Sequence, residues 1–372
     1  MIKIFHTGDN HLDSPFFRLS LSKREAERAH QRDIFAKMMS FVKENKYDLV
    51  LISGDLLDFP SVSPETADEV VRAFSSLDCP VVISPGNHDP YLKTPLYSQG
   101  QLPDNVYVFN SNELQIFEFE ELGVEVCGYA FMKNNVFLPP LKELALPKTD
   151  KCRILCAHAD LNASSSVYAP ISDSDIERLG FTYAALGHLH KVVEPYRKGA
   201  SLIGYCGFPE GRAFDEEGDG GALSVTIDKG KAVAERVVFS EKRYVYDSVS
   251  IESCLSDADT ENRIRILLSE KGYGKETALR LSLEGMIDID YVPDQKLLTR
   301  VIEPLLMKLS ITDNTYPEID LSSLENDFTL RGEIYRTLKN DILSSDESLR
   351  KKATEALRVA LLAIDGRNIS LR

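Results

Sequence analysis

The chain has 372 residues, more than one average domain holds, so we expect a large domain with a smaller appendage. Hydrophobic residues at 43% and charged residues at 27% are near the averages for globular proteins, which argues against a chain dominated by disorder. The formal net charge of -15 argues against a protein that binds duplex nucleic acid by charge alone, because that affinity comes from Lys and Arg.

The first hundred residues alternate short apolar runs with helical stretches. Residues 2–7, 48–53 and 80–84 are predicted to be buried strands, each followed by a turn that contains Gly. Residues 23–45 between the first two strands are predicted to form a helix, because apolar side chains recur there at helical spacing. This β-α-β order predicts parallel strands.

Strands dominate from about residue 105 onward. They are predicted at residues 106–109, 124–129, 153–157, 183–186, 201–206 and 222–227. We therefore expect a second, more mixed sheet that packs against the first one, with helices outside. The predicted fold class is α/β, a four-layer αββα sandwich over residues 1–240.

The pattern restarts near residue 241. Leu279, Leu281 and Leu283 alternate with polar residues as in a half-exposed strand, and helices are predicted on both sides, at residues 262–271 and 295–309. This predicts a small α+β domain over residues 241–320. Two further helices are expected at residues 330–342 and 346–364, within a C-terminal segment of residues 321–372.

The last predicted helix carries an apolar stripe at helical spacing, formed by Leu349, Ala353, Ala356, Leu357, Ala360, Leu361 and Ile364. The stripe predicts a docking site for a partner. The alternative is that it packs on the chain's own domain.

Five short motifs lie at or just after the carboxyl ends of predicted strands. They are Gly8-Asp9-Asn10-His11, Gly54-Asp55-Leu56-Leu57-Asp58, Gly86-Asn87-His88-Asp89, Ala157-His158-Ala159-Asp160 and Gly187-His188-Leu189-His190. Ligands of open α/β sheets bind at this edge. A glycine lets the backbone turn sharply there, so the side chains are predicted to converge on one site.

The motifs supply carboxylate, amide and imidazole ligands. This mixture suits Mn²⁺, Fe²⁺ or Zn²⁺, whereas the imidazoles argue against calcium and the lack of thiolates argues against a structural zinc. Each motif alone is more typical of a turn or a strand end. Five of the seven histidines fall in the motifs, however, which favours a metal site.

Together the five motifs resemble the signature of the calcineurin-like metallophosphoesterase superfamily, over residues 1–240. The stretch His11-Leu12-Asp13-Ser14-Pro15-Phe16, the turn Gly207-Phe208-Pro209-Glu210-Gly211-Arg212 and the added C-terminal domain are similar to SbcD-type DNA repair exonucleases, above all to the YhaO-like branch. The resemblance implies a catalytic domain over residues 1–240, a capping domain over residues 241–320 and a docking segment over residues 321–372.

The resemblance also implies roles for single residues. One divalent metal ion would be held by Asp9, His11, Asp55 and His190, and the other by Asp55, Asn87, His158 and His188, with Asp55 as the bridge. His88 matches the family's catalytic histidine, and Asp89 matches the acid beside it that would orient the ring.

The implied activity is that of a Mn²⁺-dependent DNA exonuclease or endonuclease in a repair complex, working with an SbcC-like coiled-coil ATPase. Hydroxide held between the two ions would attack phosphorus in line, and His88 would protonate the leaving oxygen. One alternative is a phosphodiesterase or phosphatase for a small nucleotide or a lipid-linked phosphate, which the acidity suits. A second is a scaffold without catalysis, although every ligand position is filled. A homodimer is left open.

Three residues outside the metal set have simpler interpretations. His6 is expected to be a buried histidine that a neighbour satisfies, and His30 to lie at the edge of a packed helix face. Arg212 is a candidate for binding a substrate phosphate, with pairing to Glu210 or Asp215 as the alternative.

The six cysteines are scattered, and a reduced cytoplasmic compartment is expected. Cys152 and Cys156 are interpreted as core residues, with metal binding as the alternative. No apolar run is long enough to span a bilayer and no signal peptide is expected, so membrane contact is not predicted.

Overall fold

The structure is a computed structural model that describes residues 1–17, 19–137 and 140–366. It divides into two compact units, Met1–Arg243 and Tyr244–Arg372, here called the first and the second unit. The predicted boundary at residue 320 falls inside the second unit. All six cysteines are free thiols, and none of the described helices is long and apolar enough to cross a membrane.

The first sheet of the first unit has six strands, in the order β12-β11-β1-β2-β3-β4. They are β1 (Ile2–Thr7), β2 (Leu49–Ile52), β3 (Val81–Ile83), β4 (Val106–Val108), β11 (Gly221–Asp228) and β12 (Lys231–Val238). The strands from β1 to β4 are parallel, as the β-α-β order predicts, and β11 and β12 close the sheet in antiparallel pairing.

The second sheet is also six-stranded, in the order β5-β6-β7-β8-β10-β9. Its strands are β5 (Gln115–Phe119), β6 (Val124–Gly128), β7 (Cys152–His158), β8 (Tyr183–Gly187), β9 (Tyr196–Lys198) and β10 (Ser201–Tyr205). The central strands β6, β7, β8 and β10 are parallel, whereas both edge strands are antiparallel. The predicted mixed sheet is therefore present.

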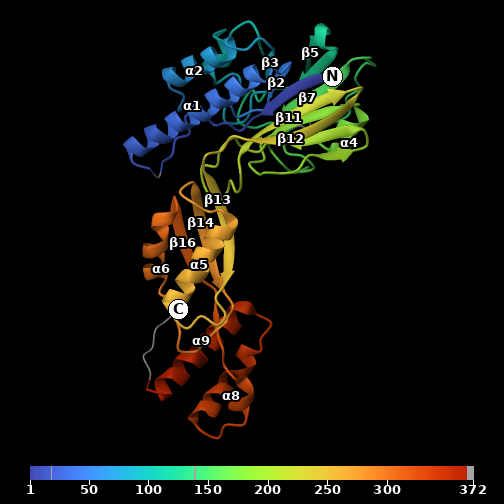
Figure 1. The fold of residues 1–372 in the computed structure, drawn as a ribbon. Helices are drawn as coiled ribbons and strands as arrows, with labels where there is room; N and C mark the ends of the chain where they lie inside the picture. Colours follow the sequence, from blue (N-terminus) through green and yellow to red (C-terminus); the bar gives the residue numbers. More distant parts are fainter. Residues whose placement is uncertain (18, 138–139, 367–372) are drawn as a thin grey trace. The chain divides into compact units, whose positions relative to one another are not determined.

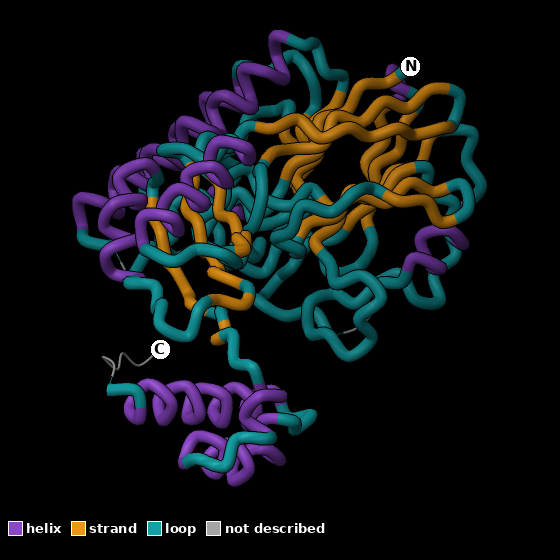
Figure 2. The backbone as a smooth tube through the Cα atoms, turned by 60° about the horizontal axis from the view of Figure 1, so that its bottom comes forward, coloured by secondary structure: helices purple, strands orange, loops and turns teal. Residues whose placement is uncertain are grey.

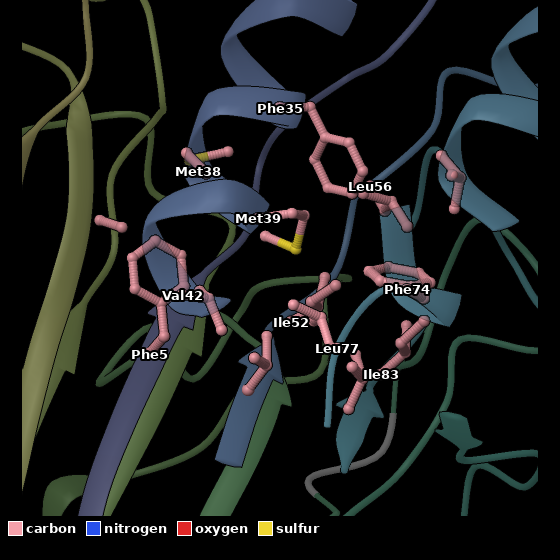
Figure 3. Packing of buried hydrophobic residues seen from close by; sticks show 14 of the residues in the cluster. Phe5, Phe35, Met38, Met39, Val42, Ile52, Leu56, Phe74, Leu77 and Ile83 are labelled. Carbon is pink, nitrogen blue, oxygen red and sulfur yellow. The ribbon is translucent and has the colours of Figure 1, made fainter. Parts of the chain in front are cut away.

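Helices α1 (Leu21–Glu44) and α2 (Pro64–Ser75) lie on one face of the first sheet (Figure 1). Figure 3 shows apolar side chains of α1 and α2, among them Phe35, Met39 and Phe74, packed against Phe5 and Ile52 of the strands. Neighbouring residues of β1 point to opposite faces, so Ile4 enters a different core from Phe5.

The second core lies between the two sheets, and a third covers the far face of the second sheet. Ile4 and Leu51 of the first sheet share the second core with Val126 and Ile154 of the second sheet. The third core joins Leu155, Ala184 and Ile203 to Ile176 of α4 (Asp173–Arg178). Three cores between four layers make the αββα sandwich that the sequence predicts; its strands are drawn in orange in Figure 2.

The second unit begins with a three-stranded sheet, in the order β13-β14-β16, and a two-stranded one, β15-β17. These strands are β13 (Arg243–Ser250), β14 (Thr277–Glu284), β15 (Met286–Ile287), β16 (Lys308–Asp313) and β17 (Tyr316–Pro317). Leu279, Leu281 and Leu283 of β14 are buried against α5 (Asp257–Lys271) and α6 (Gln295–Ile302), as their alternation predicts.

One predicted element of this unit is wrong. The helix expected over residues 295–309 ends at Ile302, a 3-10 turn covers Glu303–Leu305, and β16 begins at Lys308. Pro304 lies in that turn and has no backbone N–H to continue the helix. The buried Leu309 and Ile311 belong to the alternating pattern of a strand.

The chain closes with α7 (Leu321–Glu325), α8 (Leu330–Ile342) and α9 (Glu347–Ile364). The last two helices pack side by side, below the C label in Figure 2. Ala353, Leu357 and Leu361 from the middle of the apolar stripe are buried against α7 and α8. Only the ends of the stripe, Leu349 and Ile364, expose large apolar side chains.

Candidate metal centre and active site

The five motifs meet at one edge of the two sheets in the first unit. Asp9 and His11 follow β1, Asp55 follows β2, and the residues Asn87, His88 and Asp89 follow β3. His158 ends β7, and the residues His188 and His190 follow β8. Because these strands are parallel within each sheet, their carboxyl ends share an edge, where ligands of α/β proteins bind.

The backbone at this edge is strained to bring the side chains together. Asp9, His11, Asp55 and His188 have φ angles of 49°, 47°, 50° and 99°, in the left-handed region that residues other than glycine rarely adopt. Such conformations persist only where the surrounding structure enforces them, and they cluster at functional sites.

Two glycines leave room for the backbone to pass close to predicted ligand side chains. A Cβ atom on Gly54 would lie 2.3 Å from His158 Nδ1, and one on Gly86 would lie 2.2 Å from Asp55 Oδ1. Either substitution would push a predicted ligand out of place, so these two motif positions require glycine for reasons of space.

The first predicted ligand set is compact. Asp9, His11, Asp55 and His190 each offer one ligand atom, and these atoms all lie within 4.8 Å of one another. The Nε2 atoms of His11 and His190 are 3.1 Å apart, and His190 Nε2 is 3.4 Å from Asp9 Oδ1. The four side chains come from three strands of two different sheets.

The second predicted set also reaches Asp55. His158 Nε2 is 3.3 Å from Asp55 Oδ2 and 2.9 Å from Asn87 Oδ1. His158 Nδ1 donates to the carbonyl of Ser53 at 3.0 Å, which leaves Nε2 as the ligand atom. His188 is more peripheral: its ring centroid is 5.0 Å from that of His158, and its Nε2 lies 3.5 Å from Asp160.

Charge within the site shifts the pKa values of these groups. Burial alone would raise the pKa of Asp55, but His158 and His11 hold it well below its usual range. Burial lowers the pKa of His158 and His190, but the Asp55 carboxylate raises the pKa of His158 to about 9, and Asp9 and Glu216 raise that of His190 to about 10. The buried carboxylates thus attract positive charge strongly, which a divalent cation also supplies.

The His88 ring has a different partner from the predicted one. Its Nδ1 lies 2.7 Å from Asp58 Oδ1, and this hydrogen bond raises the pKa of His88. Asp89, which was expected to orient the ring, instead accepts hydrogen bonds from the backbone N–H groups of Asp55, Leu56, Leu57 and Gly86, and from the Tyr97 hydroxyl. Asp58 therefore occupies the ring-orienting position, and Asp89 holds the β2 and β3 loops together. Asp58 is the last residue of the second motif, but nothing in the sequence indicated that it contacts His88.

Arg212 is paired with side chains of the chain itself, but its partners are not Glu210 and Asp215, the two that the sequence suggested. Its guanidinium pairs with Glu216, and its Nη1 donates to Ser14 Oγ at 2.9 Å. Glu216 also accepts from His190 Nδ1 at 2.9 Å. Sequence reasoning missed Glu216, because it is one of several acidic residues in this loop.

The simpler interpretations of the two remaining histidines are confirmed. His6 is fully buried between the Tyr183 hydroxyl, at 2.7 Å, and Ser53 Oγ, at 3.0 Å. His30 lies partly exposed on α1, and its Nε2 atom contacts the Glu210 carboxylate. Neither belongs to the metal site.

This geometry is that of a metallophosphoesterase, and comparison with known proteins agrees. Residues 2–192 match the calcineurin-like phosphoesterase family, so the chain belongs to that family, whose members use divalent metal ions to hydrolyse phosphoesters.

Similar proteins include a metallophosphoesterase and two DNA repair proteins. The metallophosphoesterase YhaO of Bacillus subtilis is 26% identical over 242 residues, which cover 62% of this chain and 58% of the relative. The DNA double-strand break repair proteins Mre11 of Saccharolobus solfataricus and Sulfolobus acidocaldarius are 25% and 27% identical over 225 residues, covering 56% of this chain and 55% of each relative. The chain thus spans little more than half the length of these relatives.

Proposed function

We propose that the chain hydrolyses phosphodiester bonds of DNA with two divalent metal ions, Mn²⁺ before Fe²⁺ or Zn²⁺. The position of Asp55 carries the proposal. Its Oδ2 atom lies 3.6 Å from His11 Nε2 and 3.3 Å from His158 Nε2, so one carboxylate faces an imidazole from each ligand set. A bridging carboxylate is what a two-metal site needs.

The donor types of both predicted ligand sets suit divalent cations. Asp9, His11, Asp55 and His190, whose ligand atoms lie within 4.8 Å of one another, would hold one. Asp55, Asn87, His158 and His188 would hold the other, with His158 Nε2 2.9 Å from Asn87 Oδ1. When bound, the ions supply an activated water molecule and neutralise negative charge that develops on the phosphate. Mixed oxygen and imidazole ligands suit Mn²⁺, Fe²⁺ and Zn²⁺ alike, and we place Mn²⁺ first because Asp9, Asp55 and Asn87 supply oxygen ligands, which suit it.

His88 would donate the proton that the leaving oxygen needs. Asp58 accepts the Nδ1 proton, which leaves Nε2 for the substrate, and the side chain is 49% exposed. The hydrogen bond to Asp58 raises the pKa of His88, so the protonated ring is favoured. Asp89 would contribute indirectly, by fixing the loops that carry Asp55 and His88.

DNA is favoured over other phosphodiesters by the relatives named as DNA double-strand break repair proteins. The net charge of -15 favours the alternative, a small nucleotide or a lipid-linked phosphate. A DNA nuclease of this charge requires a local basic surface or a basic partner.

A coiled-coil ATPase of the SbcC type is the partner we propose, with the helices of residues 321–372 as its docking site. Large apolar side chains are exposed around these helices, above all Phe328, Leu330 and Leu343. We propose these exposed residues for docking, because the middle of the α9 stripe is buried. A homodimer is an open alternative for the same surface.

The activity is tested with the purified full chain, incubated with Mn²⁺ and linear duplex DNA, single-stranded DNA or cyclic nucleotides. Cleavage of DNA by the native chain, and none by an Asp55→Asn variant, is the expected result. Hydrolysis of cyclic nucleotides alone would replace DNA by the small-substrate alternative. Metal-free protein after purification with Mn²⁺ would favour a scaffold.

A further inference from the structure

The loop between β10 and β11 crosses from the second sheet to the first beside the candidate active site. Within it, Glu216 is 2% exposed, and it folds back on Arg212: Arg212 N donates to Glu216 Oε2 at 2.7 Å. Arg212 Nε lies 3.0 Å and 3.1 Å from the two Glu216 oxygens. A nearly buried carboxylate is thus held in one orientation by a planar guanidinium.

Both ends of this pair reach residues of the proposed reaction. Glu216 Oε1 accepts from His190 Nδ1 at 2.9 Å, which directs His190 Nε2 toward Asp9. Arg212 Nη2 also lies 3.2 Å from His190 Nδ1, the longer of the two contacts. On the other side, Arg212 Nη1 lies 2.9 Å from Ser14 Oγ and 3.8 Å from Asp58 Oδ2. Ser14 donates to Asp58 at 2.8 Å, and Asp58 binds the His88 ring.

We propose that Arg212 and Glu216 are positioning residues, and that Arg212 couples the orientation of His190, through Glu216, to that of His88, through Ser14 and Asp58. The inference rests on the proposed function for the roles of His190 and His88. It assigns Arg212 a role other than the phosphate contact for which the sequence made it one candidate, because a phosphate would have to displace Glu216 from the guanidinium.

The variants Glu216→Gln and Arg212→Met separate the effect on His190 from the effect on His88. Asp215→Asn is the matched control. Asp215 lies exposed in the same loop, so its variant removes the same charge without touching His190. The first measurement is Mn²⁺ binding by calorimetry, which needs no activity. Partners of metal ligands typically contribute about 10- to 100-fold to metal affinity. We expect a loss in that range for Glu216→Gln and Arg212→Met, and a change below about 2-fold for Asp215→Asn.

The second measurement uses two diesters with Mn²⁺ at saturation. Arg212→Met should lower kcat on a thymidine dinucleotide more than on bis-nitrophenyl phosphate, because only the former needs the His88 proton. Glu216→Gln should lower kcat on the two diesters by the same factor. KM should change little in either variant.

The double variant tests whether Arg212 acts on the metal through Glu216. Its Mn²⁺ affinity should be no weaker than that of the weaker single variant, since residues of one network are not additive. A raised KM with unchanged Mn²⁺ affinity in Arg212→Met would overturn the inference in favour of phosphate binding. Equal losses on both diesters in that variant would disprove the coupling to His88.

Folding is followed separately by the thermal midpoint of the metal-free variants. If Arg212→Met does not fold, Glu216→Gln still tests whether Glu216 supports Mn²⁺ binding through His190. This variant should fold, because it keeps the shape of the side chain. A native chain that binds Mn²⁺ and cleaves bis-nitrophenyl phosphate but not DNA would refute the DNA substrate. The Mn²⁺ affinities of the variants would then still support or overturn the positioning role of Arg212 and Glu216.

Discussion

At the scale of single residues, His88 decides how the proposed reaction depends on its leaving group. An alkoxide leaves slowly without a proton, and positioned acid catalysis contributes about 10²- to 10⁴-fold. A nitrophenolate leaves unaided. We therefore expect His88→Ala to lose DNA cleavage by a factor in that range and to retain much more activity on bis-nitrophenyl phosphate, with metal content unchanged.

The His88 prediction has two competing outcomes. Equal losses on both substrates with the metals retained would mean that His88 only positions the phosphate. Equal losses together with lost metal would make His88 a ligand, an arrangement that its grouping with His11 and Asp58 also allows.

Asp55 faces both ligand sets, so its loss should affect both metals. Asp55→Asn is expected to abolish activity and to lower metal occupancy at both positions, because a neutral amide cannot replace a bridging carboxylate. His11→Ala should weaken chiefly one metal, since His11 belongs to the first set only. Elemental analysis of the two variants checks this, and full occupancy in Asp55→Asn would contradict the bridge.

His6 should make the stability of the protein fall in mild acid. Burial lowers its pKa from 6.5 to about 3. Between these values the unfolded chain binds the proton and the folded chain does not, so unfolding becomes more favourable as the pH falls. The contribution is about 1.4 kcal/mol per pH unit, or about 2 kcal/mol between pH 6.5 and pH 5.

The matched variant for this effect is His6→Gln, whose amide can still pair with Tyr183 and Ser53. Urea unfolding at pH 7 and pH 5 should show a smaller loss of stability for His6→Gln than for the native chain. The same loss in both would assign the pH dependence to other groups.

At the scale of elements, the apolar stripe of α9 is mostly buried, so it stabilises the packing of α9 on α8. Leu357 is fully buried against α8, whereas Phe328 is 99% exposed. Leu357→Ala should destabilise this helix pair by about 2–5 kcal/mol, and Phe328→Ser by no more than about 0.5 kcal/mol. Hydrogen exchange of the α8 and α9 amides measures both, and equal protection in the two variants would refute the packing.

The same pair of variants separates folding from partner binding. Deletion of residues 346–372 would uncover the apolar side of α8, so lost association after deletion could not be assigned to docking. Phe328→Ser should weaken association with the proposed ATPase and leave the fold intact.

At the scale of the whole molecule, all proposed metal ligands lie in the first unit. A ligand that binds only the folded state stabilises it by about 2.7 kcal/mol at one hundred times its Kd. Mn²⁺ should therefore slow hydrogen exchange in the loops after β1, β2, β3, β7 and β8, and EDTA should reverse this. Slowed exchange in β14 of the second unit, with no effect on these loops, would place the metal elsewhere.

The sequence by itself determined the fold class and the chemistry of the site. Alternation, helical spacing and the glycines after strands are local properties, and the ends of parallel strands are bound to share an edge. The resemblance of the five motifs to one family adds the prediction that Asp9 and Asp55 of one sheet meet His158 and His190 of the other.

Only the tertiary structure decided which neighbours these residues have. Asp58 rather than Asp89 reaches the His88 ring, because the loop after β2 turns one carboxylate outward while backbone N–H groups capture the other. Glu216 was hidden among the acidic residues of its loop, since its value depends on contact with His190, 26 positions away. Periodicity states which face of an element is apolar, but what covers that face, as for α9, depends on the path of the chain between elements.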